Sequence, residues 1–131
     1  MNDQHSPELN AAAVKGRMAR FMEPCILLLL DQAKGHGYEL MERLNRFGFD
    51  AGSGDMATLY RTLRSLEDAG MVESEWEEGG QGPQKRVYRV TDNGRALLNE
   101  WIAVVRINRD RLTTLLEAYR DATHSPDQKE K

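Results

Sequence analysis

One short segment of the sequence gathers most of the side chains that could recognise another molecule. It supplies a hydroxyl, a phenol and two guanidinium groups, on Thr58, Tyr60, Arg61 and Arg64. At a helical period the leucines of this segment share one face, and the two arginines lie on the opposite face. Arginine can pair with guanine or grip a phosphate, and hydroxyl groups can donate to phosphate oxygens. The segment therefore predicts a helix with one face in a core and the other against DNA.

A second set of basic groups follows a glycine-rich stretch. Lys85 and Arg86 come shortly after residues 79–82, which link two short runs of alternating character. This pattern predicts a β-hairpin whose tip touches the phosphate backbone or enters the minor groove. Four acidic side chains in and just after the first run, the last of them Glu78, would repel phosphate unless they point away from DNA. Strand alternation places three of the four on one face, so these three can point away from DNA. They are Glu73, Glu75 and Glu77.

Two tyrosines each have a second interpretation. Tyr38 opens a predicted helix, where its phenol can donate to a phosphate near the helix N-terminus. A partly buried core position is the alternative for Tyr38. Tyr60 lies at the flank of its helix, so it can either face DNA or pack against the helix that begins at Tyr38. Both residues are therefore candidate DNA contacts with a structural alternative.

Two helices are expected before this segment. The apolar run that starts at Phe21 predicts a buried helix, and Pro24 is acceptable in its first turn. A second helix is expected over residues 38–47, with one apolar face, and Gly48 ends it. A loop at residues 50–54 then leads to the candidate DNA-reading helix.

The candidate DNA-reading helix has its own start and stop signals. Asp55 can cap it by accepting a backbone N–H, and Gly70 can end it in the left-handed conformation. Two strands are expected next, at residues 71–76 and 86–90. Three helices followed by a hairpin predict a winged helix-turn-helix, an α+β fold that is mainly α with a small β-hairpin.

A long helix is expected after the hairpin, from a cap at Thr91 to about Ala122. Its apolar residues recur at intervals of three and four, with the polar Asn108 in the same seam. About thirty residues at 1.5 Å each would extend roughly 45 Å, more than the small preceding domain can cover. The helix therefore predicts a homodimer. The residues expected at its interface come from this seam and, for Val105, from a second apolar row beside it: Leu97, Trp101, Val104, Val105, Asn108, Leu112, Leu115 and Tyr119.

The composition fits one globular domain with an appended element. Hydrophobic residues make up 40% of the 131 residues and charged residues 30%, which argues against a disordered chain. We expect a flexible arm at residues 1–16, the winged-helix domain at 17–90, the dimerisation helix at 91–122 and a disordered tail at 123–131. No apolar run is long enough to span a membrane and no secretory signal is visible, so a cytoplasmic protein is expected.

Nothing in the sequence points to catalysis, a cofactor or a metal. The histidines, His5, His36 and His124, have no evident nucleophile or carboxylate partner. The single cysteine, Cys25, lies in an apolar run and is expected to serve packing. No cysteine or histidine cluster has zinc-site spacing. We therefore do not expect an enzyme.

Three motifs resemble the PadR family of transcriptional regulators, in order and in spacing. They are His36-Gly-Tyr-Glu-Leu40, Thr58-Leu-Tyr-Arg-Thr-Leu63 with Leu66-Glu-Asp-Ala-Gly-Met-Val72, and Arg86-Val-Tyr-Arg-Val-Thr91 through Gly94. The resemblance covers roughly residues 20–105. It implies a homodimeric repressor, or less often an activator, with an N-terminal winged helix and a C-terminal dimerisation helix. The segment at residues 20–30 also resembles, less closely, the polyhydroxybutyrate-responsive repressors of this family.

The resemblance does not decide the roles of two residues. Many family members have proline after the tyrosine of the DNA-reading helix, where this chain has Arg61, so the operator sequence cannot be carried over. In multidrug-binding members, a tryptophan at the place of Trp101 lines a dimer-interface pocket and stacks on flat drugs. An ordinary interface anchor is the alternative for Trp101, since tryptophan is enriched at interfaces.

The expected function is that of a DNA-binding, ligand-responsive repressor that binds a pseudo-palindromic operator as a homodimer. The expected partners are double-stranded DNA, a second copy of the chain and a small aromatic or hydrophobic effector. The alternative is a winged helix without specific DNA binding that serves as a protein-interaction or granule-associated module. The net charge of −3 suits that alternative, whereas the basic residues of the helix and the hairpin argue against it.

Overall fold

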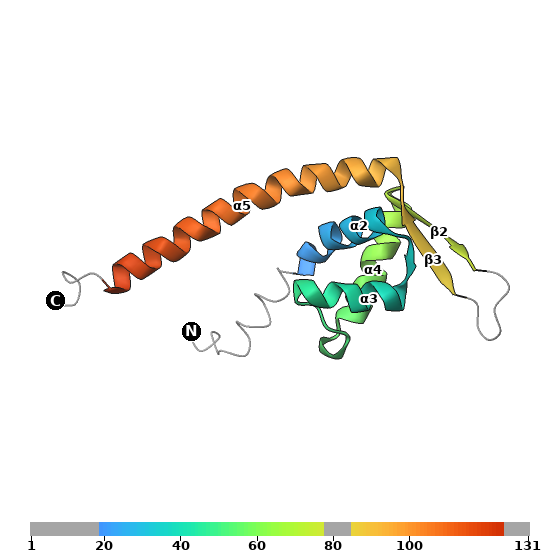
Figure 1. Ribbon diagram of the computed structural model, residues 1–131, viewed down its shortest axis with the longest axis horizontal. Coiled ribbons are helices and arrows are strands. Elements are labelled where there is room, and N and C mark those ends of the chain that lie inside the picture. The colour runs from blue at the N-terminus through green and yellow to red at the C-terminus, as the bar shows by residue number, and fades with distance from the viewer. Residues whose placement is uncertain (1–18, 78–84, 125–131) are drawn as a thin grey trace, which may run out of the picture. The chain divides into compact units, whose positions relative to one another are not determined.

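The structure, a computed structural model, describes residues 19–77 and 85–124 (Figure 1). The predicted arm at residues 1–16, the hairpin tip at 78–84 and residues 125–131 of the predicted tail lie outside the described residues. The chain divides into two compact units, of which the first ends at Leu98 and the second begins at Asn99. The boundary falls inside the last helix.

Three α-helices form the core of the described part of the first unit. They are α2 (Met22–Gln32), α3 (Gly37–Leu44) and α4 (Asp55–Asp68), with short 3-10 turns at Ala19–Phe21, Asn45–Phe47 and Ala51–Ser53. The largest fully buried side chains come from all three helices and from the sheet: Met22, Ile26, Leu27, Leu40, Leu44, Leu59, Leu63 and Val72. The order of helices expected from the apolar pattern is confirmed.

Within the described residues, the sheet contains one strand more than the sequence predicts. β2 (Val72–Trp76) and β3 (Arg86–Val90) form the expected antiparallel hairpin. A short strand, β1 (Gly35–His36), pairs with the other side of β3, where only a turn was expected. The strand order β1-β3-β2 makes β3 the central strand, and the whole is an α+β winged helix (Figure 1).

The two ends of α4 confirm one predicted cap and correct the other. Gly70 follows the helix with a φ of +79°, so a left-handed glycine ends α4 as expected. Asp55 was expected to be the N-cap, but that position belongs to Gly54, which has a φ of +85°. Asp55 is the first helical residue, and its carboxylate accepts the N–H of Asp50 at 2.8 Å instead. Its side chain therefore closes the preceding loop.

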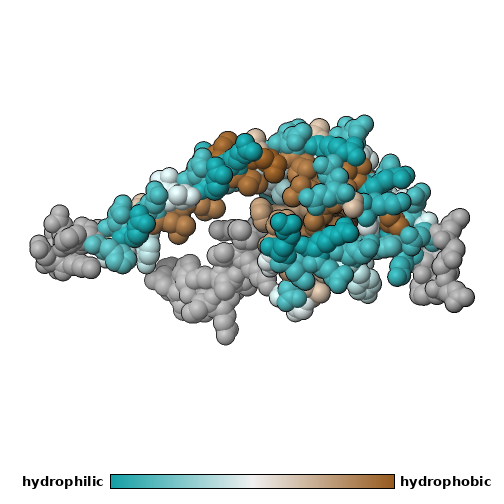
Figure 2. All heavy atoms as spheres, in the orientation of Figure 1, coloured by the Kyte–Doolittle hydropathy of each residue, from teal (hydrophilic) through white to brown (hydrophobic). Residues whose placement is uncertain are grey.

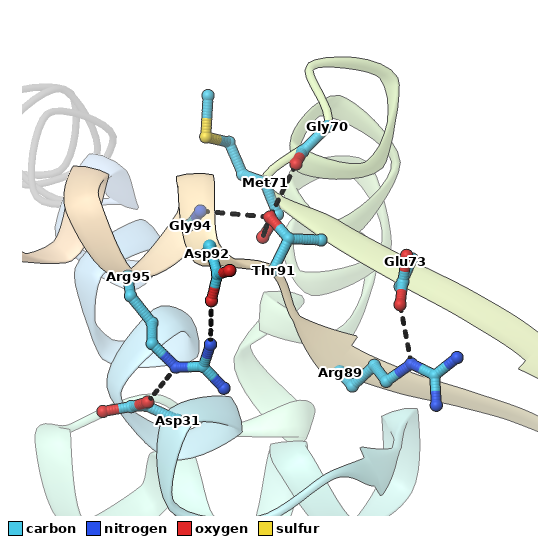
Figure 3. Close-up of polar contacts among 9 residues, drawn as sticks. All are labelled: Asp31, Gly70, Met71, Glu73, Arg89, Thr91, Asp92, Gly94 and Arg95. Carbon is cyan, nitrogen blue, oxygen red and sulfur yellow. Dashed lines mark hydrogen bonds and ion pairs between the residues drawn. The ribbon is translucent and has the colours of Figure 1, made fainter.

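The last helix, α5 (Asp92–His124), is 33 residues long. Thr91 caps it as expected, because Thr91 Oγ1 accepts the N–H of Gly94 at 3.1 Å (Figure 3). The helix continues past its expected end, so Thr123 and His124 belong to it rather than to a disordered tail. At 1.5 Å per residue, α5 extends about 50 Å.

Candidate nucleic-acid interface

The outer face of α4 is basic and exposed. Arg61 and Arg64 are both exposed, opposite the buried leucines of the helix, as the sequence predicts. Arg61 Nη2 donates to Thr58 Oγ1 at 3.2 Å, which holds the guanidinium along the helix surface. Thr62 donates to the carbonyl of Thr58 at 2.8 Å, so its hydroxyl is used within the helix. α4 thus presents two cations and the half-buried hydroxyl of Thr58.

The two tyrosines lie close to each other, at α3 and α4. Tyr38 is 74% exposed, so the core position considered for it is wrong. Tyr60 is 39% exposed and lies against Gly37, where an added Cβ would stand 2.8 Å from Tyr60 Cζ. Burial and the neighbouring Tyr38 phenol raise the pKa of Tyr60 above its ordinary value. Tyr60 therefore packs against the start of α3, as its flank position allows, and keeps part of its ring accessible.

His36 joins the start of α3 to the base of the hairpin, a link that the sequence does not predict. Its backbone N–H donates to Glu39 Oε1 at 2.8 Å, as in a capping box. Its ring nitrogens lie 2.9 Å from Glu39 Oε1 and 3.2 Å from Glu77 Oε1. The backbone hydrogen bond from His36 is the main cause that lowers the pKa of Glu39. These bonds hold the base of the hairpin beside the first turn of α3.

Glu39→Gln is expected to remove a part of the stability that depends on pH. Because the folded-state pKa of Glu39 is lowered, its carboxylate stabilises the fold above its unfolded-state pKa. That contribution is lost as the pH falls through the folded-state pKa. The variant should lose only a few tenths of a kcal/mol at neutral pH, the usual worth of a negative charge in the first turn, because glutamine can still accept the His36 N–H. The difference should close as the pH falls through the folded-state pKa of Glu39.

Urea unfolding at a series of pH values, followed by circular dichroism, measures this difference. Glu42→Gln is the matched control, because Glu42 is an exposed glutamate on the same helix. A gap between wild type and Glu39→Gln that stays constant from neutral to acid pH would contradict the stabilising role of the carboxylate.

The hairpin leaves the predicted DNA contact Lys85 accessible, but the strand register places it on the same face as the acidic residues of β2. Lys85 is exposed and makes no side-chain hydrogen bond or ion pair with the residues that the structure describes. Arg89 Nε lies 2.8 Å from Glu73 Oε1 (Figure 3), and Arg89 Nη1 lies 3.9 Å from Glu75 Oε1. Together with the bond from His36 to Glu77, these pairs give each of the three carboxylates a partner within the fold, and all three side chains stay more than half exposed on the face of Lys85.

Arg86, the other predicted wing contact, is engaged within the fold. Its Nε donates to Ser74 Oγ at 2.7 Å, and its Nη2 lies 3.8 Å from Glu67 Oε2. Its guanidinium lies 5.0 Å from the centre of the Trp76 ring. The sequence shows a cation beside a glycine-rich stretch and gives no sign of these partners. Of the two cations, Lys85 is the one whose side chain is left for another molecule.

Most residues predicted for the dimer interface are exposed along α5. The exposed large apolar side chains of this helix are Ile102, Val104, Ile107, Leu112, Leu115, Leu116 and Tyr119. Leu97, Trp101 and Val105 are partly exposed, and Asn108 is exposed. Figure 2 shows apolar side chains gathered along α5 between polar ones. An accumulation of exposed apolar side chains of this kind is typical of an interaction site.

The described residues offer no support for catalysis. They contain no cluster of side chains that would suit a metal ion. Cys25 is buried, and burial raises the pKa of its thiol to about 11, so the thiol stays protonated and unreactive. None of the described helices combines the length and the apolar character that a membrane crossing requires.

Two known proteins with sequences similar to this chain are described as transcriptional regulators, one of them as a probable one. The sequence model of the transcriptional regulator PadR-like family matches residues 26–100. The probable transcriptional regulator Rv1176c of Mycobacterium tuberculosis is 36% identical over 78 residues, 60% of this chain and 41% of that protein. The transcriptional regulator Rv3488 of the same organism is 43% identical over 65 residues, 50% of this chain and 57% of that protein. The match thus spans about half the length of these relatives.

Solved structures share the fold. A PadR family transcriptional regulator from Eggerthella lenta is 28% identical, with a TM-score of 0.66 over 83% of this chain and 89% of that chain. Bacillus subtilis PadR, solved in complex with operator DNA, is 24% identical, with a TM-score of 0.55 over 63% of this chain and 47% of that chain. The family match covers more than half of the chain and contains all three motifs that resemble it. The chain therefore belongs to the transcriptional regulator PadR-like family, whose members are regulators rather than enzymes.

Proposed function

We propose that the chain is a cytoplasmic, homodimeric repressor that binds a pseudo-palindromic DNA operator and responds to a small effector. The observation that carries this proposal is the outer face of α4, where Arg61 and Arg64 are exposed. A helix fits the major groove, and arginine supplies both phosphate contact and guanine recognition there. Membership of a family of transcriptional regulators supports the proposal, as does the fold shared with the operator-bound Bacillus subtilis protein.

In the proposed complex, each protomer places one α4 in a major groove. Thr58, Tyr60, Arg61 and Arg64 contact bases or phosphates from α4, and the exposed phenol of Tyr38 donates to a phosphate beside α3. Lys85 approaches the phosphate backbone from the hairpin. Two-fold symmetry then requires half-sites about 34 Å apart, which is one helical turn of DNA.

The proposed dimer forms along α5. The apolar side chains that α5 exposes would be covered by the same helix of a second copy, which is the usual arrangement of a two-stranded seam. An effector that binds at this seam can change the spacing of the two α4 helices only if it binds one spacing more tightly than the other. We assign a flat aromatic effector to Trp101, which lies in the same seam.

Mobility shift on DNA from the protein's own promoter, across a salt series, tests the proposal. The log–log dependence of affinity on salt should have a slope of about −0.9 per phosphate contact. Arg61→Ala and Arg64→Ala should each weaken specific binding about tenfold or more. If the lost contact is to phosphate, the magnitude of this negative slope should also decrease by roughly 1.8, because a dimer carries each residue twice.

Arg46→Ala is the matched control for these variants. Arg46 is exposed after the end of α3, and its guanidinium lies 5.2 Å from the centre of the Phe47 ring. It should change neither the affinity nor the salt dependence. The absence of any specific shift would contradict the proposal, as would Arg61→Ala and Arg64→Ala variants that bind like the wild type. Either result would favour a protein-interaction module instead.

A further inference from the structure

Four side chains connect α4 to both strands of the hairpin. The Ser74 hydroxyl donates to Glu67 Oε2 at 2.7 Å, and Arg86 Nε donates to Ser74 Oγ at 2.7 Å. Arg86 Nη2 lies 3.8 Å from Glu67 Oε2, and the Arg86 guanidinium lies 5.0 Å from the centre of the Trp76 ring. We call Glu67, Ser74, Trp76 and Arg86 the wing clamp, because they join α4, β2 and β3.

The strand register places the hairpin part of the wing clamp on the inward face of the sheet. Ser74 lies opposite Tyr88, and Trp76 lies opposite Arg86. Tyr88 is buried, and alternate residues of a strand share a face, so Arg86 lies on the same side as Tyr88. Lys85, one position earlier, falls on the other side. The two neighbouring cations therefore point in different directions.

A contact between Arg86 and phosphate would require the wing clamp to open. The Arg86 side chain is 39% exposed and the Glu67 side chain is 32% exposed, so both side chains are partly buried. Removing the guanidinium would leave the Glu67 carboxylate with the Ser74 hydroxyl as its hydrogen-bond partner in this cluster. Charge-assisted hydrogen bonds between partly buried groups are stronger than neutral ones, and breaking them leaves a charge without its partner. Lys85 makes no such bond with the described residues, so a contact between Lys85 and phosphate would break none of them.

We propose that Arg86 is a positioning residue for DNA binding. Through the wing clamp it fixes the angle between the hairpin and α4, and thereby the place of Lys85, without touching DNA itself. This inference rests on the proposed function, because it assigns a role within the DNA contact. The two cations then have different roles: Lys85 contacts the phosphate backbone, and Arg86 holds the hairpin at a fixed angle to α4.

The wing clamp can be tested in the absence of DNA. The chain contains two tryptophans, so Trp101→Phe leaves Trp76 as the fluorophore. In that background, Arg86→Gln and Glu67→Gln should each shift the Trp76 emission to longer wavelength and increase its quenching by acrylamide. Lys85→Gln is the matched control and should change neither. An unchanged Trp76 spectrum in Arg86→Gln would overturn the inference.

Binding to operator DNA separates positioning from phosphate contact. Arg86→Gln should weaken binding about tenfold, and Arg86→Gln and Lys85→Gln should each decrease the magnitude of the salt slope by up to roughly 1.8 per dimer, because both weaken the same Lys85 contact. The variant that carries both changes should show no further decrease, whereas an Arg86 that touched phosphate itself would add a second decrease of roughly 1.8. Glu67→Arg combined with Arg86→Glu should recover part of the affinity that Arg86→Glu loses alone, because the exchange keeps the charge pair. A further decrease of the slope when Arg86→Gln is added to Lys85→Gln, or no recovery in the exchanged pair, would overturn the inference.

The two measurements also distinguish this inference from the proposed function. If the wild type binds no DNA, the proposed function fails and the positioning role fails with it, while the Trp76 spectrum still decides whether the clamp forms. If the wild type binds DNA and Arg86→Gln binds equally well, the positioning role alone fails. Thermal unfolding of each variant shows whether it is folded. If Arg86→Gln does not fold, Glu67→Gln tests the wing clamp instead, because it removes the other charge of the clamp.

Discussion

Leu112→Glu combined with Leu115→Glu is expected to give a monomer and to weaken binding to a two-half-site operator by about 100- to 10,000-fold. Both leucines lie on the apolar side of α5 and are 57% and 63% exposed in the single chain. A second copy of α5 would bury them, and a buried charge without a partner strongly opposes association. Affinity then falls because the second half-site is no longer bound by a tethered copy.

The two threonines between these leucines provide a matched control. Thr113 and Thr114 are exposed and lie off the apolar side of the helix, so Thr113→Glu combined with Thr114→Glu adds the same charge to the same turn. This control should remain a dimer and keep most of its affinity. Sedimentation velocity measures the assembly, and mobility shift on whole and half operators measures the affinity. A leucine variant that still sediments as a dimer would show that α5 is not the main interface.

The helices were predictable because their signals are local. The buried face of α4 follows from the spacing of Leu59, Leu63 and Leu66, which depends only on the helical period. Gly70 ends the same helix because glycine adopts the left-handed conformation without strain. In each case the deciding residues lie within one or two turns of the feature. The exposed position of Arg61 was predictable for the same reason.

The errors concern features that depend on more distant contacts. Asp55 has a suitable side chain for a cap, but the preceding loop brings Gly54 into that position and turns the Asp55 carboxylate towards the N–H of Asp50. β1 is two residues long, so it shows no alternation that a sequence pattern can reveal. It forms because Gly35 pairs with Tyr88, far along the chain.

The candidate site also contains residues whose roles follow from local sequence and others whose roles depend on distant partners. The chemistry of Arg61 and Arg64 can be predicted from their own helix, because an exposed helical face needs no partner. The partners of Arg86 cannot be predicted, since Ser74 and Glu67 approach it only when the hairpin closes on α4. The sequence therefore placed both wing cations against DNA, whereas the structure gives one of them a set of internal partners.

Gly94→Ala is expected to destabilise the winged helix by about 3 kcal/mol or more, among the larger effects of a single methyl group. Gly94 lies in the first turn of α5, where its N–H donates to Thr91 Oγ1 (Figure 3). A Cβ at this position would collide with the carbonyl oxygen of Met71. It would also stand 2.6 Å from Val90 Cγ2 and 3.1 Å from the carbonyl carbon of Met71.

Thermal unfolding followed by circular dichroism measures this effect, and Gly52→Ala is the matched control. A Cβ at Gly52 would meet only ordinary contacts in an exposed turn, the nearest at 3.6 Å. At about 4–8 °C per kcal/mol for a domain of this size, the melting temperature should fall by roughly 12 °C or more for Gly94→Ala. Gly52→Ala should change it by only a few degrees.

The clash at Gly94 cannot be relieved cheaply, because its main partner is backbone that several bonds hold in place. The Thr91 hydroxyl donates to the carbonyl of Gly70 at 2.7 Å and to that of Met71 at 3.0 Å (Figure 3). The Thr91 N–H also donates to the Met71 carbonyl, at 3.0 Å. Moving Met71 would therefore disturb the end of α4, the start of β2 and the cap of α5 together. A Gly94→Ala variant that melts like the wild type would mean that α5 can begin further from Met71 without cost to the fold.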